Sequence, residues 1–209
     1  MYNRQEVKRF AANSFSAAYW PLVGVCFLLP LLASIAGGLG AGVLALLVQG
    51  PLAVGLNMYC LRRWRGEDPT LDSAFVDGFG NYGHVLGGYL WMVLFTALWS
   101  LLFVIPGIVK AYAYAMTSYI LGDCKQVSAT DALKLSKRMM KGHKWELFVL
   151  HLSFLGWDIL NALTAGILGI FYVAPYKNIS FAGYYALRKE QALAEGIITQ
   201  EELMGAPIA

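Results

Sequence analysis

Residues 19–61 read YWPLVGVCFLLPLLASIAGGLGAGVLALLVQGPLAVGLNMYCL, a run of 43 residues without Asp, Glu, Lys, Arg or His. A helix needs roughly 20 apolar residues to cross the hydrocarbon core of a bilayer, so this run is long enough for two spans. The whole 209-residue chain has the same character, with 58% apolar and 14% charged residues. Soluble domains carry about 45–50% apolar and about 25% charged residues. The sequence therefore predicts an all-α, polytopic membrane protein.

Hydropathy and turn residues divide the chain further. The glycine-rich stretch at 37–42 predicts the first tight turn. Six transmembrane helices are predicted, at about 19–36, 43–61, 84–103, 107–122, 145–163 and 165–187. The six-span domain, 19–188, then lies between an N-terminal segment, 1–18, and a tail, 189–209. In this tail Thr199 has the position of a helix cap, and the alternative is a frayed terminus.

The basic residues predict the orientation. Fourteen of the 16 Lys and Arg residues precede the first span, follow the second or sixth, or lie between the fourth and fifth. Cytoplasmic loops carry the excess of Lys and Arg in membrane proteins, so these segments are predicted to be cytoplasmic. Both termini then lie in the cytoplasm, as an even number of spans requires.

Short helices are expected at the cytoplasmic membrane surface. Residues 128–131 have the spacing of a helix-capping box, and the segment after them places four cations on one helical face. These cations are predicted to contact anionic lipid headgroups: Lys134, Lys137, Arg138 and Lys141. The alternative is that they only determine topology from a solvated loop. A second such segment covers residues 70–82.

The sequence also contains a candidate internal repeat. The distances from Asp72 to His84 and from Asp131 to His143 are equal, and each pair begins in a cytoplasmic segment and ends at a span. Three prolines lie in or at the head of the even spans and are predicted to break those helices: Pro51, Pro106 and Pro175. The pattern favours a two-span unit repeated in parallel, with coincidence as the alternative.

Three stretches resemble one bacterial family of polytopic membrane proteins. They are IPGIVKAYAYAM at 105–116 with YILGD at 119–123, ALKLSKRMMKGHKWELF at 132–148, and LSFLGW at 152–157 with LTAGI at 163–167 and Pro175-Tyr176. Gly50-Pro51-Leu52 and Gly55 resemble its weaker N-terminal motif. The family is catalogued as a domain of unknown function, number nine-seven-five. The resemblance covers roughly residues 50–185 and implies a multi-pass protein of the bacterial inner membrane, without implying a substrate or a catalytic residue.

Three ionisable residues within the predicted spans are candidates for an intramembrane polar site: Lys110, Asp158 and Lys177. Such residues are costly in hydrocarbon and often functional. Lys110 and Lys177 both follow a predicted proline break, and Asp158 departs from the apolar residue that the resemblance leads us to expect. An Asp–Lys pair beside a broken helix could bind an anion or relay protons. The alternative for the lysines is that their stems extend to the membrane surface.

Two hypotheses for function follow. The sequence lacks the nucleophile-elbow, His-Glu-x-x-His and phosphate-loop motifs. Cys26, Cys60 and Cys124 have no metal or redox spacing and are expected to be free and buried. We therefore expect a non-enzymatic accessory membrane protein with no cofactor and no bound metal or nucleic acid. It would contact the lipid bilayer and either another membrane protein or a second copy of itself. The alternative is a small transporter or channel with its site near the proline breaks.

Overall fold

The computed structural model describes residues 4–39, 43–102 and 104–206, and this part of the chain contains helices and no strands. The all-α prediction is confirmed. Twelve α-helices and one π-helical turn follow in order: α1 (Arg4–Ala17), α2 (Tyr19–Leu39), α3 (Val43–Trp64), α4 (Leu71–Phe79), α5 (Tyr82–Leu102), α6 (Val104–Tyr114), α7 (Thr117–Asp123), α8 (Ala129–Met139), α9 (Lys144–Leu152), α10 (Leu155–Leu163), η1 (Gly169–Val173), α11 (Ala174–Ala194) and α12 (Gln200–Leu203).

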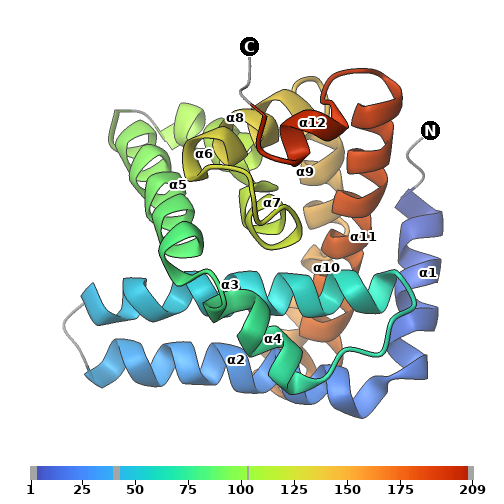
Figure 1. Ribbon diagram of the computed structural model, residues 1–209. Helices are drawn as coiled ribbons and strands as arrows, with labels where there is room; N and C mark the ends of the chain where they lie inside the picture. The colour runs from blue at the N-terminus through green and yellow to red at the C-terminus, as the bar shows by residue number, and fades with distance from the viewer. Residues whose placement is uncertain (1–3, 40–42, 103, 207–209) are drawn as a thin grey trace.

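Helix α3 is the centre of the packing. It lies antiparallel beside α2 across the lower part of Figure 1 and also contacts α4, α5, α7 and α11. Helices α5 and α11 run up the picture, across the direction of the α2–α3 pair. The largest fully buried side chains include three tyrosines and one arginine: Tyr59, Tyr184, Tyr185 and Arg188. The three cysteines are free and buried, as expected from their apolar surroundings.

The six-span prediction is not confirmed. In the described ranges, one helical stretch, Lys144–Leu163, is long and apolar enough to cross a membrane. Gln5–Ser16 and Tyr19–Ile35 pass the same test only when taken together, and they are bent by 98°. The first part of the predicted glycine turn at 37–42 is helical in the structure, because α2 continues to Leu39. The rest of that turn, residues 40–42, lies outside the described residues.

The predicted fourth span is two helices in the structure. Helix α6 ends at Tyr114 and α7 begins at Thr117. The Ser136 hydroxyl of α8 donates a hydrogen bond of 2.9 Å to the Ala113 carbonyl at the end of α6. Carbonyls in the last turn of a helix have no donor within the helix, so this buried contact from a distant segment supplies one and stabilises the early end.

The prediction that Pro51 breaks its helix is wrong, because α3 is continuous through it. Proline leaves the carbonyl four residues earlier without its usual donor. That carbonyl belongs to Leu47, and the Tyr82 hydroxyl donates to it at 3.3 Å. The other two prolines do coincide with helix starts: Pro106 lies in the first turn of α6, and Pro175 is at the start of α11, directly after η1. A missing N–H costs little in a first turn.

The two short helices expected at the cytoplasmic side are present as α4 and α8. Thr70 and Ser128 cap them, each side chain accepting from the backbone N–H three residues later. The apolar face of α8 packs inside the protein, because Ala132, Leu135 and Met139 are fully buried and α8 contacts α5, α6 and α7. Amphipathicity in this helix therefore reflects the protein core, while its lysines remain outside.

The tail forms a capped helix and is not a frayed terminus. Helix α11 ends at Ala194, Gly196 adopts a left-handed backbone conformation with φ of +67°, and Thr199 forms a complete capping box with Glu202. Buried Ile198 and Leu203 fix this segment to the rest of the molecule.

Two glycines allow α3 and α4 to touch. A Cβ atom at Gly55 would overlap the Ala74 carbonyl, and one at Gly78 would overlap the Pro51 carbonyl. The two backbones therefore meet without intervening side chains. Because backbone atoms form both overlaps, neither can be relieved by rotating a side chain.

We expect Gly55→Ala and Gly78→Ala each to lower the free energy of unfolding by about 1–3 kcal/mol, through overpacking. The matched control is Gly24→Ala in α2, where a Cβ meets nothing within 4 Å. That change should leave stability equal or higher, since alanine favours a helix more than glycine does. Thermal unfolding of the three variants in detergent tests this, and equal stability of Gly55→Ala and Gly24→Ala would contradict the close contact.

Candidate functional site

Asp123, the last residue of α7, is the centre of a charged cluster. Its carboxylate accepts two hydrogen bonds from the Arg65 guanidinium, at 2.9 and 3.1 Å, and one from Lys189 Nζ at 2.6 Å. The Tyr185 hydroxyl donates a fourth at 3.1 Å. The Asp123 side chain is 8% exposed. These bonds join the C-terminal end of α3, the end of α7 and the second half of α11.

The surroundings of Asp123 act on its pKa in opposite directions. Burial alone would raise the pKa, but the hydrogen bonds and charges of Arg65 and Lys189 outweigh it and hold the pKa below its usual value. The carboxylate is therefore ionised at neutral pH and forms ion pairs with two cations at once.

A second acid, Asp77 of α4, has the same kind of environment. Its side chain is 2% exposed, and it is paired with Arg62 at 2.8 Å and with Lys125 at 3.2 Å. A pocket of about 580 Å³ lies between the Asp77 and Asp123 pairs, with Leu203 and Met204 on its wall. Neither acid was among the residues predicted from sequence.

The structure brings two of the three predicted polar-site residues together. Lys177 Nζ of α11 lies 3.0 and 3.3 Å from the two carboxylate oxygens of Asp158 in α10. Both side chains are partly exposed, to a groove of about 460 Å³ between α2 and the α10–α11 connection.

The groove is shaped by an irregular piece of backbone. Ala165 and Gly166 turn the chain with positive φ, and η1 follows. The Asn161 side-chain oxygen accepts a 2.6 Å hydrogen bond from the Gly169 amide, and a Cβ atom at Gly169 would overlap that side chain. Single π-helical turns of this kind are frequent at functional sites.

The third candidate, Lys110, lies elsewhere. Its Nζ is 4.5 Å from the centre of the Trp99 ring in α5, a cation–π arrangement, and it does not line the groove. The expected grouping of Lys110 with Asp158 and Lys177 is therefore absent.

The predicted lipid-contacting cations on α8 and just after it are not equivalent. Lys137 and Lys141 are exposed, and Lys134 pairs with Asp131 at 3.0 Å. Arg138 instead binds the tail, donating to Glu202 at 2.6 Å and to the Ile197 carbonyl. Its main contact is thus within the protein.

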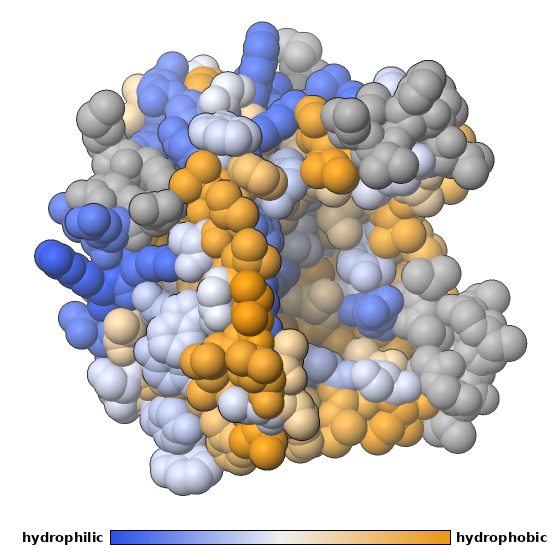
Figure 2. All heavy atoms as spheres, turned by 180° about the vertical axis from the view of Figure 1, so that it is seen from behind, coloured by the Kyte–Doolittle hydropathy of each residue, from blue (hydrophilic) through white to orange (hydrophobic). Residues whose placement is uncertain are grey.

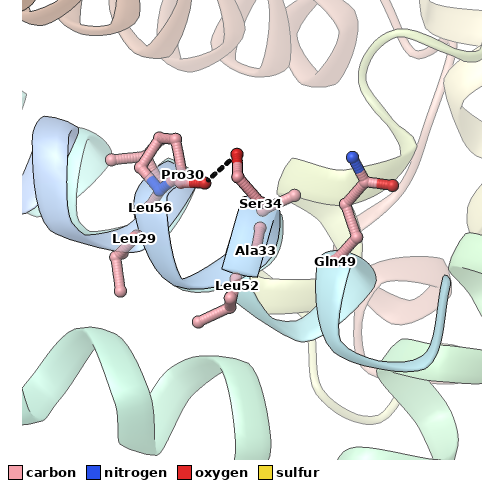
Figure 3. A pocket seen from close by; sticks show the side chains of 8 residues that line it. Leu29, Pro30, Ala33, Ser34, Gln49, Leu52 and Leu56 are labelled. Carbon is pink, nitrogen blue, oxygen red and sulfur yellow. Dashed lines mark hydrogen bonds between the residues drawn. The ribbon is translucent and has the colours of Figure 1, made fainter. Parts of the chain in front are cut away.

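A third cavity, of about 430 Å³, separates parts of α2 and α3 and has mainly apolar walls (Figure 3). The Ser34 hydroxyl donates to the Pro30 carbonyl within its own helix at 2.8 Å, and Gln49 is the other polar side chain drawn there. None of the described residues that line this cavity is titratable. Among the described residues, no group of three or more His, Cys, Asp or Glu side chains could hold a metal ion.

Comparison with known proteins gives one match. Residues 91–191 match the model of the family described as "Protein of unknown function (DUF975)". This part of the chain is a DUF975 region. The resemblance seen in the sequence is confirmed there, whereas Gly50-Pro51-Leu52 and Gly55 lie outside the matched range. No curated protein and no solved structure matches the chain. The DUF975 region includes Asp123, Asp158 and Lys177, while Arg65 and Asp77 lie before it.

Asp123→Asn should lower the free energy of unfolding at neutral pH by about 2–4 kcal/mol, because it leaves the Arg65 and Lys189 charges without their buried partner. A carboxylate with a lowered pKa in the folded state stabilises it above the unfolded-state pKa, and that contribution disappears as the pH falls through the folded-state value. Wild-type stability should therefore fall below about pH 4, and the variant should lose part of that acid dependence.

Asp68→Asn is the matched control, since Asp68 pairs with Arg63 but is 93% exposed. It should change stability by less than about 0.5 kcal/mol. Thermal unfolding as a function of pH distinguishes the two, and equal effects at both positions would rule out the proposed importance of the Asp123 cluster.

Proposed function

We propose that this chain is a multi-pass membrane protein with a non-enzymatic accessory role, embedded through six spans with its cationic ends in the cytoplasm. The observation that carries the proposal is the Asp123 cluster. In the six-span topology, spans two, four and six all end on the cytoplasmic side. The residues just after those three ends are Arg65, Asp123 and Lys189, and the Asp123 carboxylate binds both of the other two directly.

Exposed apolar side chains support embedding in lipid. Contiguous apolar surface is unusual on a soluble monomer and is typical of membrane or protein contact. Figure 2 shows a continuous band of hydrophobic side chains on the face opposite the view of Figure 1. Helix α10 buries none of its residues. Large exposed apolar residues lie along α2, α5 and α10: Trp20, Phe27, Leu31, Leu32, Ile35, Leu90, Trp91, Leu94, Phe95, Leu98, Trp99, Leu155, Ile159, Leu160 and Leu163.

The arrangement of the charges favours the accessory role over transport. Asp158 and Lys177 neutralise each other, and Lys110 stacks on Trp99 away from them. Most of the residues that line the groove beside this pair are apolar. Transport remains the second candidate because this groove does reach both members of an ion pair beside an irregular helix.

Membrane integration and topology can be tested together. We expect the full chain to remain in the membrane fraction after alkaline carbonate extraction. Reporter insertions after Asp68 and at the C-terminus should be cytoplasmic, and an insertion at Gly166 should be on the opposite side. Release into the soluble fraction, or reporters after Asp68 and at the C-terminus on opposite sides of the membrane, would overturn the proposal.

The Asp158–Lys177 pair distinguishes the accessory role from transport. Replacing both residues, Asp158→Leu with Lys177→Met, should keep or raise thermal stability, because an apolar pair often replaces a desolvated ion pair without loss. Lys177→Met alone should be less stable than the double variant, since it leaves Asp158 without its partner. Lys110→Met is the control outside the groove. An ion or solute flux in proteoliposomes that disappears in the double variant would favour the transporter.

A further inference from the structure

The groove beside Asp158 and Lys177 combines two chemistries. One wall carries the ion pair, 3.0 Å apart at its closest. Other lining residues are apolar, among them Phe27 and Leu31 on α2 and Ile170 on η1, all of them partly exposed. A volume of about 460 Å³ is within the range of small-molecule sites. Such a site suits a ligand with a charged end and an apolar end.

The charges of Lys177 and Asp158 indicate which chemical groups the polar end of the ligand carries. The Lys177 side chain is 26% exposed and the Asp158 side chain 42%, so each keeps a face toward the groove. Lysine offers three N–H donors and an ionised carboxylate only acceptors. A complementary ligand therefore carries an anion and a hydrogen-bonding cation close together.

We propose that this groove binds a phospholipid whose headgroup holds a phosphodiester and a primary ammonium, as in phosphatidylethanolamine. Lys177 binds the phosphodiester, Asp158 accepts from the ammonium, and the acyl chains lie against the apolar wall. This inference rests on the proposed membrane location and adds a ligand class to it.

Other lipid headgroups fit the pair less well. A headgroup with only a phosphodiester satisfies Lys177 but places its negative charge near Asp158, which repels it. A choline headgroup carries a positive charge without N–H groups, so it cannot donate a hydrogen bond to Asp158. Discrimination among lipids of equal chain length is therefore the expected signature.

The test uses the full chain purified in detergent, with dioleoyl lipids of three headgroups added at equal concentration. Phosphatidylethanolamine should raise the unfolding temperature by about 5–10 °C at roughly 100 times its Kd. Phosphatidylglycerol and phosphatidylcholine should raise it by clearly less. Native mass spectrometry should show one retained phosphatidylethanolamine.

Variants test whether the stabilisation by phosphatidylethanolamine comes from the groove. Lys177→Met and Asp158→Asn should remove the preference for phosphatidylethanolamine, Lys177→Arg should retain it, and Lys110→Met, outside the groove, should leave it unchanged. The wild-type comparison of three lipids needs no variant, so a variant that fails to fold does not prevent the test.

Each contrary outcome has a distinct meaning. Equal stabilisation by phosphatidylglycerol overturns the zwitterionic assignment, and no stabilisation by any lipid overturns the site. Both results leave the proposed function standing if carbonate extraction shows an integral protein. Failure of that extraction overturns the proposed function independently of the lipid response in detergent.

Discussion

The ion-paired Asp123 carboxylate is the interaction on which the assembly of this helical protein depends most. An ionised carboxylate removed from water is very costly without partners. Here Arg65, Lys189 and Tyr185 provide four hydrogen bonds to it, from α3 and α11. Apolar helices can pack against one another in many arrangements of similar energy. A buried anion that needs donors at fixed positions is compatible with few of these arrangements. The cluster thus selects which helix ends meet.

Regular features of the sequence predict the elements well. The starts of α2, α3 and α5 lie within two residues of the starts of the predicted spans. Ser128 and Thr199 cap helices as their local spacing indicates. These signals act within one turn of helix, so no knowledge of distant contacts is needed to interpret them.

The features that the sequence did not predict depend on contacts between distant residues. The division of α6 from α7 involves Ser136, and the continuity of α3 at Pro51 involves Tyr82, each more than 20 residues away. The Asp123 cluster likewise joins residues 58 to 66 positions apart. Asp158 and Lys177 were recognisable because charge within an apolar stretch is conspicuous without a partner. Asp77 and Asp123 lie outside the predicted spans, where an acidic residue is not unusual until its partners are known.

The π-helical turn before α11 has a consequence for how this helix serves two sites. An extra residue in a turn rotates everything after it by about 100° relative to an uninterrupted α-helix. Lys177 lies just after that turn, and Lys189 lies near the far end of the same helix. Inserting or deleting one residue in η1 would therefore change the angular phase between the groove wall and α11. Because Lys177, Tyr185 and Lys189 all follow η1 on α11, such a change would turn α10 and its Asp158 relative to Lys177 and leave the three α11 side chains in the same register with one another.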